Sequence, residues 1–343
     1  MDKFNIDDKI EKVLRDLKRN YNIVEKLEHI PNNIKNEVAL GNITEEEGKQ
    51  CLKALEEVEN RIIYILEKIG IIKKLDNIAR KCINLHFSDE EATVFNSKIG
   101  GMPYLPLTME YPKIEDEPLR FFIQINFEEI PEFENFPNKG ILQIFLENDE
   151  FMYGLGDTIE ENRIKIIYHK DIIKDENLLH KNLDNLKFNN NIFLFDFPFY
   201  DEIGMRDIYF QKKLVGKISK SYPDFTSRYK ELEGFFDYCY KQIENYFKET
   251  EEEYITKELV EDYFDNIRYL HKEFKATTIK LGGYPTFCQD EFEEIFENKI
   301  VLLNSESDDF NITWGSFGIA NFFITEEDLK NLDFSKVIYN CNN

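Results

Sequence analysis

Three glutamines are the polar side chains of this chain best placed to contact a ligand: Gln124, Gln143 and Gln289. Gln124 and Gln143 interrupt apolar runs that read as strands, and a buried amide needs hydrogen-bond partners. Each amide therefore belongs to a structural network or contacts a ligand, and strand alternation also allows Gln124 to face solvent. The structural and solvent-facing interpretations are favoured, and ligand contact is the functional alternative.

A group of carboxylates near the C-terminus is a second candidate for chemistry. Asp308 and Asp309 follow Glu306 closely and would suit a carboxylate pair or a Ca²⁺ site. A Ca²⁺ loop normally alternates its oxygen ligands and contains a glycine, which this segment lacks. A solvated hairpin tip is the favoured interpretation, because turns are rich in Asp, Asn and Ser.

Motifs for catalysis, metals and cofactors are weak in this sequence. Ser316 stands one place early for a nucleophile elbow within Gly315–Gly318, and Gly154-Leu155-Gly156 is half of a dinucleotide fingerprint. No phosphate loop, HExxH motif or paired-cysteine spacing occurs, and the five histidines are far apart. We therefore assign no catalytic residue, no metal site and no cofactor from the sequence.

Trp314 is the single tryptophan of the chain and lies between the acidic segment and two glycines. Such a residue either forms a rigid amphipathic wall of a cleft or packs in the core, where its indole N–H donates to a backbone carbonyl. The core interpretation is favoured. If the chain has a ligand cleft, the residues predicted to line it are Gln124, Gln289, Asp308 and Trp314.

One phrase occurs twice in the sequence. Residues 98–105 read KIGGMPYL and residues 280–287 read KLGGYPTF. Paired glycines permit positive φ and close backbone approach, and a proline two positions later cannot donate to a strand ladder. The phrases therefore predict two structural turns, formed by Gly100, Gly101 and Pro103 and by Gly282, Gly283 and Pro285.

The elements expected after each phrase follow the same order. Both phrases precede an apolar strand, an acidic turn and further strands, and we expect residues 98–170 and 280–325 to form equivalent units. Self-similarity at one long spacing indicates an internal duplication. Two related units of this kind would create a cleft between the halves, where ligands bind most often.

Helical patterns flank and separate these halves. The spacing predicts a helix over Ile6–Leu17, a break at Pro31-Asn32-Asn33, and a helix over residues 44–69 that Thr44 and Glu47 begin with a capping box. Helical spacing returns over 223–275. We expect a helical N-terminal extension over 1–85 and a duplicated domain over 86–343, with halves at about 93–200 and 276–343 and a helical insert between them.

Composition narrows the class of protein. The 343 residues carry a formal net charge of −24, which repels nucleic acid and anionic membranes and favours solubility or a basic partner. The five cysteines are scattered, no signal peptide follows Met1, and apolar runs are shorter than the ~20 residues of a membrane helix. We expect a reduced cytoplasmic protein.

Several of these segments together resemble the YwqG-like family, a bacterial domain of unknown function. The resemblance covers residues 93–343 approximately and rests on both Gly-Gly phrases, on 122–127 and 140–145, and on 314–324. Ser316 stands where the family often has an acidic residue, and Cys288 stands where a hydroxyl residue is common. The resemblance implies a fold and names no activity.

The sequence thus predicts an α+β fold with two related, mainly antiparallel β units, a helical insert and a helical N-terminal extension. The favoured function is non-catalytic binding of a protein or a small ligand, with neutralisation of a basic toxin as one specific form, because an acidic protein is steered toward a basic one. The alternative is an enzyme whose site is assembled between the two β halves from residues distant in sequence.

Overall fold

The computed structural model describes residues 30–147, 153–156, 162–187, 210–223, 232–251, 255–265, 279–287, 298–307, 312–315 and 318–342. The chain divides into two compact units. Residues 1–79 and 228–275 form a helical unit, and residues 80–227 and 276–343 form a sheet unit. Strand β1 begins at Arg80, so the expected boundary near residue 85 falls inside a strand of the sheet unit.

The helical unit combines the segment before the sheet with the insert between the two Gly-Gly phrases. Its described helices are α2 (Ile30–Ala39), α3 (Glu45–Lys68), α4 (Ile71–Ile78), α5 (Phe235–Glu249) and α6 (Lys257–Asp265). Cation–π contacts of Lys68 with Tyr246 and of Lys74 with Tyr238 join the two segments. The insert therefore packs with the N-terminal helices.

Helix α3 begins and ends where the sequence predicts. Thr44 Oγ1 accepts a hydrogen bond from the Glu47 backbone N–H, and the Glu47 carboxylate accepts one from Thr44 N at 2.9 Å, which is the predicted capping box. Leu55 and Ile62 are buried, and Ile69 is the half-buried C-cap residue. Gly70 follows with a φ of 80° and ends the helix.

The break expected at Pro31-Asn32-Asn33 is wrong. Helix α2 starts at Ile30 and runs through these residues. Proline has no N–H to lose in the first turn of a helix, and its fixed φ suits that position. The helix expected over Ile6–Leu17 lies outside the described residues.

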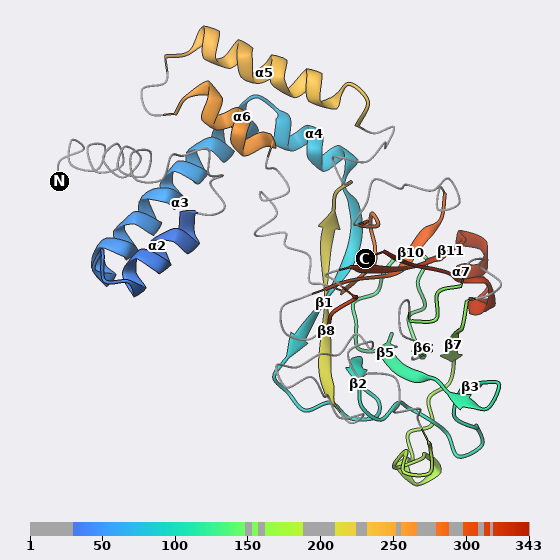
Figure 1. Ribbon diagram of the computed structural model, residues 1–343. Helices are drawn as coiled ribbons and strands as arrows, with labels where there is room; N and C mark the ends of the chain where they lie inside the picture. Colours follow the sequence, from blue (N-terminus) through green and yellow to red (C-terminus); the bar gives the residue numbers. More distant parts are fainter. Residues whose placement is uncertain are drawn as a thin grey trace. The chain divides into compact units, whose positions relative to one another are not determined.

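The sheet unit contains a ten-stranded antiparallel sheet that curls (Figure 1). Its order is β12-β11-β10-β9-β1-β8-β2-β5-β6-β7. The strands are β1 (Arg80–Ser88), β2 (Lys98–Gly100), β5 (Arg120–Asn126), β6 (Ile141–Leu146), β7 (Ile164–His169), β8 (Gln211–Ser221), β9 (Ile279–Gly282), β10 (Ile300–Glu306), β11 (Ile319–Ile324) and β12 (Ile338–Asn342). The predicted α+β class is confirmed.

The strand order is the same on both sides of the central pair β1–β8. We call β2-β5-β6-β7 the first wing and β9-β10-β11-β12 the second wing; each begins with one of the two phrases. The link from β1 to β2 is the loop 89–97, whereas the link from β8 to β9 includes the helical insert.

Short elements complete the sheet unit. Strands β3 (Lys113–Ile114) and β4 (Glu117–Pro118) form a small hairpin, and η3 (Glu176–Leu178), α7 (Glu326–Lys330) and η8 (Phe334–Lys336) are short helical turns. No helix among the described residues has the length and apolar character needed to cross a membrane.

One hydrophobic core is shared by the two wings. It includes Ile123 and Ile144 from the first wing and Leu302 and Phe322 from the second. Because side chains alternate along a strand, the residues between these core positions lie on the opposite face of the sheet. That opposite face carries the polar residues that define the candidate site.

Candidate functional site

The two Gly-Gly phrases form turns that only glycine accommodates easily. Gly100 and Gly101 have φ of 60° and 71°, and Gly282 and Gly283 have φ of 72° and 77°. A Cβ on Gly101 would lie 2.6 Å from an atom of Gln211, and one on Gly283 would lie 2.5 Å from Ser221. Each turn therefore lies directly against the central strands β1 and β8.

The lysine that opens the first phrase is buried inside its own turn. Lys98 is 1% exposed, and its Nζ donates to the Met102 carbonyl at 2.6 Å and to Gln211 Oε1 at 3.2 Å. Desolvation by burial lowers the pKa of Lys98 to about 7. The side chain is thus an amine with two protein acceptors that is partly neutral near pH 7.

Gln124 lies beside Lys98 and uses its full hydrogen-bonding capacity. Its Oε1 accepts from the Tyr104 backbone N–H at 2.9 Å and from Gln143 at 2.8 Å. Its Nε2 donates to the carbonyls of Val94 and Asn96, each at 2.9 Å. Because an amide has two donors and two acceptor positions, Gln124 is saturated, and a ligand would have to displace one of these bonds.

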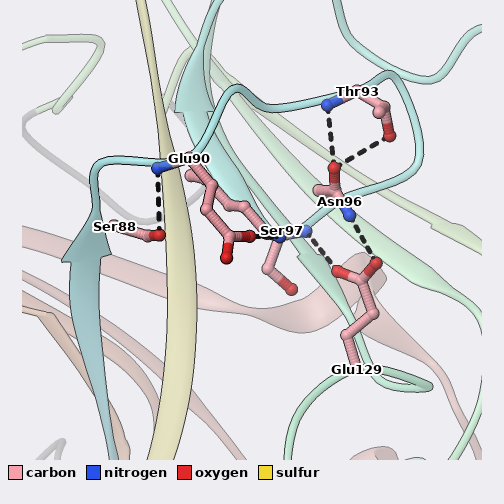
Figure 2. A network of polar contacts seen from close by, with 7 residues as sticks. Ser88, Glu90, Thr93, Asn96, Ser97 and Glu129 are labelled. Atoms are coloured by element: carbon pink, nitrogen blue, oxygen red, sulfur yellow. Dashed lines mark hydrogen bonds and ion pairs between the residues drawn. The ribbon is translucent and has the colours of Figure 1, made fainter.

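The acceptors of Gln124 belong to the loop 89–97, which a second network holds in place (Figure 2). Asn96 Oδ1 accepts from the backbone N–H and the hydroxyl of Thr93, at 2.8 and 2.9 Å. Glu129 accepts from Asn96 Nδ2 at 2.6 Å and from the Ser97 N–H at 2.9 Å. Gln124 therefore bonds to carbonyls whose positions are fixed.

Gln143 connects Gln124 to a buried histidine. Gln143 Nε2 donates to the Tyr104 carbonyl and to Gln124 Oε1, so its Oε1 is left to accept from His169 Nε2 at 2.9 Å. Burial lowers the pKa of His169 to about 4, which makes the ring neutral at pH 7. The ring packs edge-on against Tyr104 at 4.8 Å. We name this group, with Lys98, Tyr104, Gln124, Gln143 and His169, the Lys98 cluster.

The second wing repeats the arrangement with other side chains. Lys280 is 5% exposed, and its Nζ donates to Thr286 Oγ1 at 3.2 Å. Asn304 Nδ2 donates to Asn321 Oδ1 at 2.9 Å, and Asn321 Nδ2 donates to the Thr286 carbonyl at 2.8 Å. Burial lowers the pKa of Lys280, while nearby Glu306 and Cys82 act in the opposite direction. We name Lys280, Thr286, Asn304 and Asn321 the Lys280 cluster.

Strand register makes the two clusters equivalent in position. Lys98 pairs with Gln124 and Gln124 with Gln143, as Lys280 pairs with Asn304 and Asn304 with Asn321. Corresponding residues in the first and second wings are Tyr104 and Thr286, Gln124 and Asn304, Gln143 and Asn321, His169 and Asn342, and Gln211 and Cys82. At every one of these positions the residue associated with the second wing is smaller.

Two of the four predicted ligand contacts fall within the described residues. Gln124 lies in the Lys98 cluster, on the face opposite to its core neighbour Ile123. Trp314 is fully buried in the core, its indole N–H donates to Ser305 Oγ at 3.1 Å, and its ring packs edge-on against Phe122 at 5.1 Å. The structure thus places these two residues on opposite sides of the sheet.

The other two predicted contacts, Gln289 and Asp308, lie outside the described residues. Within the described ranges, no group of three or more His, Cys, Asp or Glu side chains is arranged to hold a metal ion. The solvent-facing interpretation of Gln124 is wrong, because both faces of β5 are covered.

Sequence reasoning missed Lys98, Lys280, Asn304, Asn321 and His169 as site residues. A signal was present for the lysines, since both phrases begin with lysine. Only the strand register shows that a buried amide stands beside each lysine, because β9 and β10 are separated by residues 283–299.

The fold and the paired polar clusters define a class of α+β protein with a curled antiparallel sheet and two similar wings. Comparison with protein-family models matches residues 97–342 to the family described as Domain of unknown function (DUF1963). The match covers more than half of the chain, so the protein belongs to this family. No curated protein matches the chain.

Proposed function

We propose that this protein is a non-catalytic binding protein that recognises a basic protein partner through its acidic surface. The observation that carries the proposal is the formal net charge of −24, which steers a basic protein toward this chain. The β3–β4 turn presents Glu115, Asp116 and Glu117 with exposed side chains. Among the described residues, Arg163 alone forms an ion pair with it, at 3.6 Å from Glu115. This turn is an acidic contact surface.

Neutralisation of a basic toxin in the cytoplasm is the specific form of binding that we propose. Nucleic acids and anionic membranes are unfavourable partners for a chain of this charge. Within the family, we assign the chain to the YwqG-like group on its two Gly-Gly phrases and the segment 314–324. Support for an internal duplication comes from the common strand order and the matched registers of the two wings.

A capture experiment tests the proposed partner class. The full chain, immobilised, is exposed to an extract of its native cell, and retained proteins are eluted with a salt gradient and identified. A basic protein released by moderate salt, which rebinds after purification, is the expected result, because salt screens surface charge. Retention of no basic protein at low salt contradicts the proposal.

Charge-neutral variants locate the contact. Substituting Gln, Asn and Gln for Glu115, Asp116 and Glu117 is expected to weaken the purified complex several-fold, mostly through slower association. Substituting Gln for Glu56, Glu57 and Glu67, which are exposed on α3, is the matched control with the same change of charge. Equal weakening by both sets would mean that the β3–β4 turn is not the contact surface.

An enzyme is the second candidate, and the buried amine of Lys98 is the observation that favours it. An amine whose pKa is about 7 is partly neutral at physiological pH and is a better nucleophile than a surface lysine. Reductive methylation at pH 7 distinguishes the two roles. Methylation of Lys98 before the surface lysines supports a reactive site, whereas protection of Lys98 in the folded chain supports a structural one.

A further inference from the structure

The ammonium of Lys280 has more donors than the described part of the chain supplies acceptors. A lysine ammonium has three N–H groups. Among the described residues, one acceptor, Thr286 Oγ1 at 3.2 Å, lies within hydrogen-bond distance of Lys280 Nζ. The side chain is 5% exposed, and leaving buried donors without partners is unfavourable.

The comparison with Lys98 identifies what is missing around Lys280. Lys98 donates to a carbonyl of its turn and to the Gln211 side chain, which stands opposite Gly100 in β8. The equivalent position opposite Gly282 is Cys82, which offers no amide oxygen. The Cys82 thiol lies 3.5 Å from Asn84 Oδ1 and donates to it. The second wing therefore lacks the side-chain acceptor that the first wing provides.

The amides of the Lys280 cluster add further unused donors. Asn304 Nδ2 and Asn321 Nδ2 each make one hydrogen bond within the described part of the chain, although an amide nitrogen can donate two. Both side chains are at most 1% exposed. The group thus presents one cationic and two neutral donors, which suit an anion with oxygen acceptors.

Asn340 supplies an independent observation on the next strand. It pairs with Asn321 in the β11–β12 ladder, so the two side chains lie on the same face of the sheet. Its Oδ1 is buried and has no hydrogen-bond partner among the residues that the structure describes. The equivalent residue of the first wing is Ile167, an apolar side chain. Within the described ranges, one buried acceptor in the second wing therefore also lacks a donor.

We propose that the Lys280 cluster and Asn340 bind a small carboxylate that also carries a hydroxyl or amino donor. The carboxylate oxygens accept from Lys280 and the two asparagines, and the hydroxyl or amino group donates to Asn340 Oδ1. The ligand approaches through the turn, where Gly283, Thr286 and Phe287 are partly exposed. The side chains of this cluster are smaller than Tyr104, Gln124 and Gln143, which stand at the equivalent positions of the first wing.

Lysine Nζ spectroscopy of the full chain tests this proposal. The ¹⁵Nζ resonances of Lys280 and Lys98 are assigned with Lys280→Met and Lys98→Met variants, and the chain is titrated with glycolate, acetate and inorganic phosphate. The expected result is a saturable shift of the Lys280 resonance, strongest with glycolate, and no shift of the Lys98 resonance. No saturable shift at Lys280, or equal shifts at both lysines, would overturn the proposal.

Variants separate the two ends of the ligand. Lys280→Met is expected to weaken glycolate binding about tenfold or more, as expected for loss of a charge-assisted hydrogen bond. Asn340→Leu is expected to reduce glycolate affinity to that of acetate and to leave acetate binding unchanged. Equal effects on both compounds would remove Asn340 from the site.

Cys82→Gln keeps the test decisive if Lys280→Met does not fold. This variant gives the second wing the acceptor that Gln211 gives the first, and it retains Lys280 itself. We expect it to raise the melting temperature and to abolish the glycolate shift. A folded Cys82→Gln protein that binds glycolate like the parent chain would contradict the proposal, whereas capture of a protein partner is a separate measurement.

Discussion

The Lys98 cluster and the Lys280 cluster lie on equivalent strand pairings, and they differ in the length of their side chains. In the first, two glutamines span the distance between strands, loop and turn, and Gln124 forms four hydrogen bonds. In the second, two asparagines reach each other and one turn carbonyl. One methylene group per amide thus separates a saturated network from one with spare donors.

Hydrogen bonds hold the Gly-Gly turn in place in both wings. Of the two turns, the one in the second wing also lies beside groups that can form further hydrogen bonds. Both clusters attach a Gly-Gly turn to the third strand of their wing, through Gln143 to the Tyr104 carbonyl and through Asn321 to the Thr286 carbonyl. The attachment is therefore the shared structural role. The remaining bonding capacity, at Lys280 and Asn340, is particular to the second wing.

The largest effect is expected from Gln124→Met, compared with Asn304→Leu. Gln124→Met leaves the Val94 and Asn96 carbonyls and the Tyr104 N–H unpaired, and each buried group costs about 1–3 kcal/mol, so we expect a loss on the order of 5 kcal/mol. Asn304→Leu removes one amide–amide bond and is expected to cost about 1–2 kcal/mol. Urea unfolding measures the loss of free energy of unfolding in both variants. Equal losses would show that the two clusters do not differ in their hydrogen bonding.

The next effect concerns the pH dependence that Lys98 produces. Its pKa is about 7 in the folded chain, whereas an unfolded lysine keeps an ordinary value near 10.4, so between these values the unfolded chain binds the additional proton. The free energy of unfolding contributed by Lys98 therefore rises with pH, by about 3 kcal/mol between pH 7 and about pH 9.5.

The measurement for Lys98 is the difference between the parent chain and Lys98→Met in urea unfolding across that pH range. Taking the difference removes the titration of tyrosines and cysteines common to both proteins. Lys212→Met, at a half-buried lysine of β8, is the control substitution. A Lys98→Met protein with the slope of the parent chain would show that Lys98 is not desolvated.

A smaller and equal effect is expected from Gly101→Ala and Gly283→Ala. Both residues have positive φ and lie against the central strands, and a non-glycine residue in that region costs about 1–3 kcal/mol. Thermal unfolding of the two variants should give similar losses, because the turns are alike even where the amides differ. Losses that differ by more than the spread of repeat measurements would mean that the turns are not equivalent.

The smallest effect is spectroscopic and uses Trp314, the one tryptophan. Its indole is buried between Phe122 of the first wing and Tyr153, so we expect blue-shifted emission that acrylamide does not quench. Glycolate should leave this emission unchanged, because Trp314 is on the core face and the Lys280 cluster is on the other. A change in emission on adding glycolate would place the ligand in the core.

Strands with consecutive apolar and β-branched residues were predictable from sequence, and those with alternating lysines were not. The aromatic and β-branched residues of 120–127, 140–146 and 319–324 predict strands, and these segments correspond closely to β5, β6 and β11. Strand β8 reads QKKLVGKISKS, and its half-exposed, lysine-rich pattern carries little hydrophobic signal. It is nevertheless central, because β1 and β2 pair on either side of it.

The candidate site was only partly predictable, for a physical reason that Gln124 illustrates. Alternation along a strand signals orientation when one face is exposed, but every residue of β5 is buried, and the register shifts between Phe121 and Ile123. The sequence therefore indicates that the Gln124 amide is unusual but does not indicate which way it points. The partners of Lys280 come from strands and turns distant in sequence, so spacing along the chain could not identify them.

A crystal structure at a resolution that shows ordered water would distinguish the two clusters. We expect electron density for a water molecule or an anion within hydrogen-bond distance of Lys280 Nζ, and no such density at Lys98, which donates to Met102 and Gln211. If Lys280 Nζ instead donates to protein acceptors alone, as Lys98 does, the two clusters are alike and the second wing holds no site.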